Sequence, residues 1–485
     1  MTRLGIPGWP EPPARLHFLG ICGYAVSGLA LALAELGYWV SGSDEDPYPP
    51  TTDLLTAAGI PYASHHSEEA LTAFGRPDLV ILGNQVQPGN RELAAALAAG
   101  LEVVSEAAAQ GRLAGSRPRA VVCGTHGKTT TATLLAHMLE VAGMGPGFRL
   151  GATSRNFGLA VRLGELARRS PFVFEGDEYT TSALDRSAKF LHWNPDYVGV
   201  LNLELDHPDL YPDLGAYRAP YLELVGGMPP SGRLLLRAND PAVSELAAAA
   251  ACPVTLVGGG EGEWRLQSPP GTFSGGQLLQ VSGPSGVRLP MRLPLFGLHN
   301  AENALMALAL AVAMGADPPA AAAAAESFKG PGRRFEVLGE VAGVKVVDDY
   351  AHHPTKLRAT VAAARQMAPG HQLVLVHVPH TYSRTRALLP EYREAFQGAD
   401  LLILGPIEPA RERHLEGSVS SADVAGLVEG PEVVLVRSAA EAVSAVLERV
   451  RPPALVVCCS VRGFDQVAER MLEALETGEG SRDLR

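Results

Sequence analysis

The segment Gly124-Thr-His-Gly-Lys-Thr-Thr130 contains the residue types that bind the phosphates of a nucleotide. Glycines let backbone N–H groups turn toward phosphate oxygens, and a helix that begins after the loop adds positive partial charge. The Lys128 ammonium can neutralise the β- and γ-phosphates, and the Thr129 hydroxyl can bind Mg²⁺. Because Val122 stands where the full G-x-x-x-x-G-K-[ST] pattern requires glycine, a glycine-rich turn with a chance lysine is the alternative. The residues predicted to bind ATP here are Gly124, Thr125, His126, Gly127, Lys128, Thr129 and Thr130.

Two further segments supply side chains that could complete a metal and phosphate site. Glu175 ends an apolar run, and an acidic residue at the carboxyl end of a parallel strand points toward the ligand crevice. Mg²⁺ is commonly held by one or two carboxylates together with phosphates, so Glu175 is the candidate ligand, whereas Glu178 is interpreted as part of a solvated acidic loop. His207, in Asn202-Leu-Glu-Leu-Asp-His207, could ligate a second ion or be purely structural. We predict Lys128, Glu175 and His207 as catalytic residues, with Thr129, Glu175 and His207 as metal ligands.

Another nucleotide-binding turn is predicted near the N-terminus. Gly20-Ile-Cys-Gly23 follows one short apolar run, and Asp44 follows the next. This spacing begins many nucleotide-binding turns, and an acidic residue at the end of the second strand can hold a ribose. An NAD-dependent oxidoreductase is therefore one alternative, although it leaves the loop 124–130 unexplained.

Composition narrows the class of protein. A chain of 485 residues should form two to four domains, because domains typically have about 100–200 residues. The net charge of −12 argues against nucleic acid as a partner. Five cysteines without a CxxC pair argue against a zinc ribbon or a disulfide scaffold. With no apolar stretch of about 18 residues and no apolar leader at the N-terminus, we expect a cytoplasmic protein that does not enter the membrane.

Short apolar runs alternate with helical stretches, a pattern typical of βαβ units and parallel sheets. The expected fold class is therefore α/β. The polar segment 111–119 and the segment Gly330-Pro-Gly-Arg-Arg334 are the expected boundaries. They divide the chain into three predicted domains, residues 1–116, 117–331 and 332–485.

Within these domains the pattern predicts some particular elements. Residues 254–295, rich in glycine, proline and serine, are expected to form a small antiparallel lobe, and the alanine-rich segment 301–327 a helical region. Five apolar runs in the last domain are expected to be buried parallel strands: 344–347, 373–377, 401–404, 433–436 and 455–458.

Taken in order, these motifs resemble those of the Mur ligase family. The phosphate loop, the strand-end Glu175 and the Asn-x-Glu-x-Asp-His run are followed by His299–Asn303, Arg333-Arg334 and Asp348–Pro354. The resemblance implies an N-terminal Rossmann-like UDP-binding domain, a central P-loop ATPase domain with a small β lobe, and a C-terminal Rossmann-like domain. It also implies an ATP-dependent, Mg²⁺-requiring ligase of peptidoglycan synthesis that couples a carboxylate to an amine through an acyl phosphate.

The resemblance also assigns roles to single residues. Asn300 and Asn303 would contact adenine, Arg334 a phosphate and Asp349 the nucleotide, although Asn300 could merely cap a helix and His353 could be an ordinary loop histidine. The residues implied for the UDP-sugar are Gly20, Cys22, Gly23, Ser27, Ser43, Asp44 and Asn84. Those implied for the amine substrate are His353, His380, Arg384 and Ser460.

The family members that fit best use UDP-N-acetylmuramate and join it to L-alanine or to a recycled peptide. Tyr48–Pro50, Arg186–Phe190 and Ser460 with Gly463-Phe464 resemble the peptide-adding members. The expected reaction is therefore ligation of L-alanyl-γ-D-glutamyl-diamino acid, with L-alanine as the alternative amine. A P-loop ATPase that does not ligate is an alternative of another class, and the sequence leaves the oligomeric state open.

One segment favours L-alanine instead. Pro379–Thr385 resembles the L-alanine-adding members, except that Thr381 replaces an arginine that helps to hold the amino acid carboxylate in those enzymes. This replacement leaves Arg384, Arg386 or Arg462 to bind a carboxylate.

Overall fold

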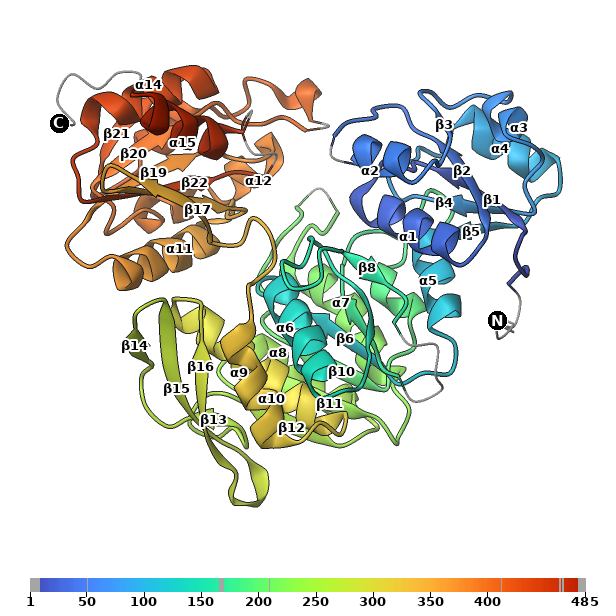
Figure 1. Cartoon of the computed structure of the whole chain (residues 1–485), viewed down its shortest axis with the longest axis horizontal. Coiled ribbons are helices and arrows are strands. Elements are labelled where there is room, and N and C mark those ends of the chain that lie inside the picture. Colours follow the sequence, from blue (N-terminus) through green and yellow to red (C-terminus); the bar gives the residue numbers. More distant parts are fainter. Residues whose placement is uncertain are drawn as a thin grey trace.

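The computed structural model of the chain describes residues 9–49, 51–164, 170–208, 210–410, 412–461, 464 and 466–478. It contains three largely parallel sheets, each formed by its own segment of the chain, and a smaller antiparallel sheet. In Figure 1 the first unit (blue) and the third (orange and red) lie above the central unit, whose antiparallel sheet is at the lower left. The expected α/β class is confirmed, while the domain limits stay a prediction. Among these residues no helix is long and apolar enough to cross a membrane.

The first unit is a five-stranded parallel sheet with the strand order β3-β2-β1-β4-β5. Its strands are β1 (Arg15–Leu19), β2 (Trp39–Ser43), β3 (Tyr62–Ala63), β4 (Leu79–Leu82) and β5 (Val103–Ser105). Its helices are α1 (Tyr24–Glu35), α2 (Thr51–Ala57), α3 (Ala70–Ala73), α4 (Arg91–Ala98) and α5 (Glu106–Ala114). The connections change direction between β1 and β4, and ligands bind outside the carboxyl ends of strands at such a point. Gly20 after β1 and Gly83 after β4 both lie there.

The central unit has the strand order β12-β11-β10-β6-β9-β7-β8, with only the short β8 antiparallel. Its strands are β6 (Arg119–Cys123), β7 (Gly147–Arg149), β8 (Val161–Arg162), β9 (Phe172–Glu175), β10 (Tyr197–Val200), β11 (Arg233–Arg237) and β12 (Val254–Val257). Its helices are α6 (Lys128–Val141), α7 (Leu214–Gly226), α8 (Pro241–Ser244), α9 (Leu298–Ala313) and α10 (Pro318–Ala324). Alternate residues of β6 face opposite layers: Val122 packs with α6 and α9, and Val121 packs on the other face of the sheet.

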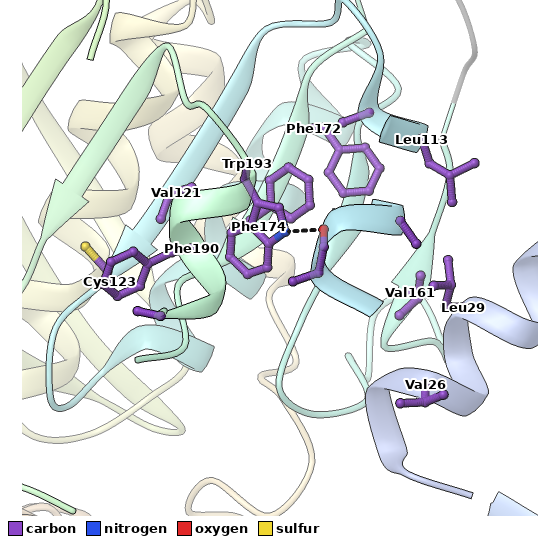
Figure 2. Packing of buried hydrophobic residues seen from close by; sticks show 14 of the residues in the cluster. Val26, Leu29, Leu113, Val121, Cys123, Val161, Phe172, Phe174, Phe190 and Trp193 are labelled. Atoms are coloured by element: carbon purple, nitrogen blue, oxygen red, sulfur yellow. Dashed lines mark hydrogen bonds between the residues drawn. The ribbon is translucent and has the colours of Figure 1, made fainter. Parts of the chain in front are cut away.

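Aromatic side chains fill that other face and reach the first unit (Figure 2). Trp193 stacks on Phe174 with ring centroids 4.5 Å apart, and its indole N–H donates to the backbone oxygen of Ala107 in α5 at 3.1 Å. Val26 of α1 and Val161 of β8 belong to the same buried cluster. Full burial of a large apolar side chain stabilises by about 1.5–3 kcal/mol, so this cluster holds the first unit against the central one.

The segment 254–295 differs partly from the expectation. Its antiparallel sheet is formed by β13 (Arg265–Leu266), β14 (Gly271–Phe273), β15 (Gly276–Ser282) and β16 (Arg288–Leu293). Residues 254–257, by contrast, form β12 and pair in parallel with β11, so this strand does not belong to the small lobe. The alanine-rich region is also interrupted, because Asp317 caps a new helix by accepting from the Ala320 N–H.

The third unit has the strand order β17-β18-β22-β19-β20-β21. Its strands are β17 (Glu336–Val341), β18 (Val344–Asp349), β19 (Gln372–His377), β20 (Leu401–Leu404), β21 (Glu432–Leu435) and β22 (Ala454–Cys459). Its helices are α11 (Pro354–Met367), α12 (Tyr382–Ala387), α13 (Ser421–Ala425), α14 (Ala439–Arg449) and α15 (Val467–Thr477). The five expected strands are present and parallel. The expectation of burial is wrong for β21, an edge strand with half-exposed residues, and β17 is an antiparallel edge strand that was not expected.

Candidate active site

The phosphate-binding loop connects β6 to α6 and lies against β10 and α9. Gly124 has φ +124°, and a Cβ there would lie 2.9 Å from the Asn202 backbone oxygen. Gly127 has φ +85° and begins α6, and a Cβ there would lie 2.4 Å from Oδ1 of Asn303. The loop is held in place because Asn202 Oδ1 accepts from the His126 N–H at 2.7 Å. The strand, loop and helix order predicted for residues 124–130 is therefore present, with both glycines required by sterics.

Thr129 and Glu175, the predicted pair of metal ligands, lie side by side. The Thr129 hydroxyl donates to Glu175 Oε1 at 2.7 Å, and Glu175 Oε2 accepts from the Gly151 N–H at 2.5 Å. Arg334 comes from the third unit and donates to Thr129 Oγ1 at 3.4 Å. A hydroxyl and a carboxylate provide the oxygen ligands that Mg²⁺ prefers, so this donor set fits that ion.

Lys128 and His207 are joined through Glu178. The Lys128 ammonium donates to Glu178 Oε2 at 2.7 Å and to the Gly124 oxygen at 2.7 Å. His207 Nε2 lies 3.2 Å from Glu178 Oε1. Burial disfavours the Glu178 charge, but Lys128 and His207 outweigh it and lower the pKa of this carboxyl to about 2. The interpretation of Glu178 as a solvated loop residue is wrong, because its side chain is 1% exposed.

Arg384 brings α12 of the third unit into contact with the loop after β10. Its Nε donates to Asp206 Oδ1 at 2.8 Å, and its two terminal nitrogens lie 3.0 Å from His207 Nδ1 and 2.9 Å from His380 Nδ1. Burial disfavours the Asp206 charge, yet His207 and Arg384 hold the pKa of this carboxyl well below its usual range. Two predicted amine-site residues, His380 and Arg384, are thus brought to the predicted catalytic His207.

The other predicted amine-site residues lie on two neighbouring loops. His353 is the N-cap of α11: its Nδ1 accepts from the Thr355 N–H at 3.2 Å and lies 3.6 Å from Glu204 Oε1. Ser460 follows β22, where its backbone oxygen accepts from Arg333 at 2.9 Å and its N–H donates to the Asp349 oxygen at 3.1 Å. Arg462 and Gly463 lie outside the residues that the structure describes.

His126, Glu204 and His353 form a compact group between the phosphate loop and α11. His126 Nε2 is in close contact with Glu204 Oε1, and the two imidazole rings have centroids 4.9 Å apart. Burial lowers the pKa of His126, as it does that of His353, which falls to about 3. Burial works against the Glu204 charge, but the interactions with His126, His353 and Thr355 together outweigh it and lower that pKa to about 2.

Three residues predicted near the nucleotide base and phosphates occupy distinct positions. Asn300 donates from Nδ2 to the Phe296 oxygen at 2.8 Å, and α9 is capped by Gly297, so the interpretation of Asn300 as an N-cap is wrong. Asn303 packs against Gly127, as described above. Asp349 ends β18, where burial raises its pKa to about 6, partly offset by Arg334.

The residues predicted for the UDP-sugar gather at the carboxyl ends of β1, β2 and β4. Asp44 Oδ2 accepts from the Cys22 N–H at 2.8 Å, and the Gly20 N–H donates to the Ser43 oxygen at 2.8 Å. Gly23 caps α1, Ser27 lies in its first turn and donates to the Tyr24 oxygen at 3.0 Å, and Asn84 follows β4. Tyr24 contacts Thr153, two residues beyond Gly151, whose N–H donates to Glu175, and so links this turn to the central site.

The sequence alone did not identify several charged groups of this region: Glu92, Glu178, Glu204, Asp206 and Lys356. Glu92 is buried and accepts from Ser43 at 2.6 Å and from His17 at 2.7 Å. Burial lowers the pKa of Lys356 to about 8. The Asp206 charge raises this pKa in part, and the nearby cations of Lys128, Arg334 and Arg384 lower it further. Glu204 and Asp206 belong to the motif around His207, so they could have been predicted from that motif. Glu92 and Lys356 lie in no motif that would have predicted a role for them.

Comparison with known proteins agrees with this geometry. Three family models match the chain: Mur ligase family, catalytic domain (residues 15–117), Mur ligase middle domain (122–311) and Mur ligase, glutamate ligase domain (333–462). A UDP-N-acetylmuramate–L-alanine ligase of Rubrobacter xylanophilus is 36% identical over 95% of this chain and 100% of its own length. The Escherichia coli UDP-N-acetylmuramate–L-alanyl-γ-D-glutamyl-meso-2,6-diaminoheptandioate ligase is 37% identical over 73% of this chain and 76% of its own.

Solved structures show the same architecture. A murein peptide ligase from Psychrobacter arcticus superposes with a TM-score of 0.70 at 26% identity, covering 95% of this chain and 98% of that chain. A UDP-N-acetylmuramate–alanine ligase from Thermotoga maritima gives a TM-score of 0.74 at 22% identity, covering 96% and 100%, which supports the fold alone. The family models and the long matches to curated relatives set aside the oxidoreductase and the non-ligating ATPase, and the chain belongs to the Mur ligase family of ATP-dependent, amide-bond-forming ligases.

Proposed function

We propose that this Mur ligase joins the carboxylate of UDP-N-acetylmuramate to the amino group of L-alanine. Relatives that match at nearly full length carry that name, which favours the alternative amine over the peptide expected from the motifs. The observation that carries the proposal is the meeting of Lys128, the Thr129–Glu175 pair and His207 with Arg384 of the third unit. In this arrangement the predicted phosphate loop reaches the His207 imidazole from one side through Lys128 and Glu178, and Arg384, the arginine proposed to bind a carboxylate, reaches it from the third unit.

A peptide as the amine substrate is the second candidate. The E. coli relative and the resemblance of Arg186–Phe190 to peptide-adding members support it. However, Lys189 is buried with its ammonium 3.6 Å from both Glu106 and Asp177, and Phe190 is fully buried. Packing therefore explains this stretch without a peptide, and the L-alanine reaction is the primary proposal.

ATP is the proposed phosphoryl donor. We assign its phosphates to the loop 124–130 with Arg334, and its base and ribose to the region of Asn303 and Asp349. Lys128 must exchange its contact with Glu178 for the phosphates. Mg²⁺ held by Thr129 and Glu175, with His207 available to a second ion, would neutralise charge on the phosphates.

In the first step a carboxylate oxygen of UDP-N-acetylmuramate attacks the γ-phosphorus, the bond to the β-phosphate oxygen breaks, and ADP leaves. The first-unit turns around Gly20 and Asp44 would hold the UDP portion, with Ser43 fixed by Glu92. Lys128 and the loop N–H groups stabilise the charge on the transferring group. The product is an acyl phosphate.

In the second step the free amine attacks the acyl carbon, a C–N bond forms, and the C–O bond to phosphate breaks while the nitrogen loses one proton. Arg384 and His380 would bind the carboxylate of the amino acid and place its amine near His207. Because these residues come from the third unit, the amine site is complete only when that unit is docked. Docking also excludes the water that would hydrolyse the acyl phosphate.

We also propose that this enzyme acts in the cytoplasm. All five cysteines are free and buried, which suits the reducing cytoplasm where we expect this enzyme to act. Fractionation of cells that produce the chain should recover it with cytoplasmic markers, and recovery with the membrane would contradict this part.

The function is tested by ADP release with UDP-N-acetylmuramate held fixed. L-alanine should support turnover with a higher kcat/KM than L-alanyl-γ-D-glutamyl-diamino acid, and Lys128→Ala should abolish it. Lys329→Ala, which removes an exposed lysine just before the boundary segment 330–334, is the matched control and should retain activity. A higher kcat/KM for the tripeptide would select the second candidate, and persistent turnover by Lys128→Ala would refute the assignment of the phosphate loop.

A further inference from the structure

His126, Glu204 and His353 have an arrangement that phosphate binding alone does not require. His126 comes from the phosphate loop, Glu204 from the loop after β10, and His353 from the start of α11 in the third unit. One potential ligand atom from each lies within 4.8 Å of the other two. Two imidazoles and one carboxylate are therefore directed at one point between the central and third units.

The polar atoms of this group are incompletely paired. His126 Nδ1 and His353 Nε2 are buried without a hydrogen-bond partner among the described residues, and the His353 side chain is 3% exposed. A buried polar atom left without a partner costs about 1–3 kcal/mol, so a purely structural cluster would be expected to satisfy them. A neutral imidazole has one lone pair, and His353 Nδ1 uses it to accept from the Thr355 N–H at 3.2 Å. His353 must therefore give up this single long hydrogen bond when it binds a metal.

The nearby charges allow a cation here. Glu204 supplies one negative charge, and Asp206, like Glu204, favours positive charge at both imidazoles. Lys356 opposes a cation, because its charge disfavours protonation of both His126 and His353. Asp206 is already paired with Arg384 at 2.8 Å, so the Glu204 carboxylate and the Lys356 ammonium leave the group without net charge before an ion binds.

We propose that His126, Glu204 and His353 bind one divalent transition-metal ion of the Zn²⁺ type, at a site separate from the Thr129–Glu175 pair. Zn²⁺ binds imidazole nitrogen and carboxylate oxygen at about 2.0–2.2 Å, so two of its ligands are at most about 4.4 Å apart. The observed spacing needs only a few tenths of an ångström of closure. Two histidines and one glutamate leave a fourth position for water or for a phosphate oxygen.

Such an ion would connect the phosphate loop directly to α11. Without an ion, one hydrogen bond already joins the loop after β10 to α11, because the Thr355 hydroxyl donates to Glu204 at 3.1 Å. A metal bond from His353 would reinforce it and hold the third unit in its docked position. The ion would therefore hold together the central and third units, which must separate for nucleotide exchange.

Binding can be measured with Co²⁺ as a spectroscopic probe on the full chain, stripped with chelator and without nucleotide. We expect one equivalent of Co²⁺ with visible d–d absorption, displaced by Zn²⁺, and at least tenfold weaker binding in Glu204→Gln and in His353→Gln. His371→Gln, in the same unit, and Glu175→Gln, at the separate Mg²⁺ site, should bind as the unchanged protein does. Binding that survives in both Glu204→Gln and His353→Gln, or that is lost in Glu175→Gln, would overturn the proposal.

A second measurement needs no variant and so does not depend on their folding. X-ray absorption at the zinc edge on the unchanged protein with one equivalent of Zn²⁺ should show two imidazole nitrogens at about 2.0–2.1 Å together with oxygen ligands. A shell of oxygen alone would refute the site, whatever the variants do.

Discussion

Glu178→Gln removes the carboxylate that joins Lys128 to His207. In the unchanged protein this carboxylate is 2.7 Å from the Lys128 ammonium and 3.2 Å from His207 Nε2, and it is 1% exposed. Its pKa of about 2, compared with the ordinary 4.5, corresponds to about 3 kcal/mol at neutral pH, because one pKa unit is worth about 1.36 kcal/mol. Breaking one partner from a buried pair typically costs about 3–5 kcal/mol. We therefore expect the variant to lose about 3 kcal/mol of unfolding free energy at pH 7.

The pH dependence distinguishes this charge effect from simple loss of packing. A carboxyl with a lowered pKa stabilises the folded state above its unfolded pKa, and this stabilisation is lost as the pH falls through the folded pKa. The difference between the two proteins should accordingly shrink between about pH 4.5 and pH 2. Urea titrations followed by tryptophan fluorescence measure both quantities. A difference below about 1 kcal/mol at pH 7, or one that stays constant in acid, would refute the reasoning.

A matched control uses an exposed pair. Glu429 is bonded to Arg393 at 2.9 Å, but the two side chains are 57% and 55% exposed. Exposed pairs contribute about 0–1 kcal/mol, so Glu429→Gln should leave the unfolding free energy nearly unchanged.

Three further predictions concern neighbouring groups. Arg384→Lys keeps the charge, but a lysine cannot contact Asp206, His207 and His380 at the same time. In the ADP-release assay, kcat/KM for the amine should therefore fall about 100-fold. An unchanged value would contradict the proposed amine site. Gly127→Ala places a Cβ 2.4 Å from the Asn303 amide oxygen at φ +85°, so ADP affinity measured by calorimetry should fall at least tenfold, and full affinity would contradict the close approach. Burial raises the pKa of Asp349 from 3.8 to about 6, so the free energy of unfolding falls as the pH rises from about 4 to about 6. In urea titrations at about pH 8, Asp349→Asn should raise the free energy of unfolding by up to about 3 kcal/mol. A gain of the same size at about pH 4 would refute this reasoning.

Elements that rest on local pattern were predictable. The largely apolar strands β6 and β10 lead into Gly124 and Asn202, and β9 ends at Glu175. A parallel sheet brings such strand ends to one edge. The phosphate loop and the Thr129–Glu175 contact follow from that rule. The break in the alanine-rich helix was less visible, because it depends on a single cap at Asp317.

Contacts between distant segments could not be read from the pattern. Glu178 looked like a loop acid because nothing local shows that Lys128 and His207 close over it. Similarly, β12 and the antiparallel lobe have the same short alternating runs, and only pairing with β11 distinguishes the strand from the lobe. Edge position, which exposes β21, is also a property of the sheet and not of the residues 432–435.

Transfer of ¹⁸O tests the central claim, amide formation through an acyl phosphate, most directly. UDP-N-acetylmuramate labelled with ¹⁸O in its carboxylate is incubated with the enzyme, ATP, Mg²⁺ and L-alanine, and the phosphate released is analysed by mass spectrometry. Because the oxygen that attacks the γ-phosphorus leaves with the phosphate, the account predicts one labelled oxygen in each phosphate and ADP as the nucleotide product. Unlabelled phosphate, or AMP in place of ADP, would contradict it.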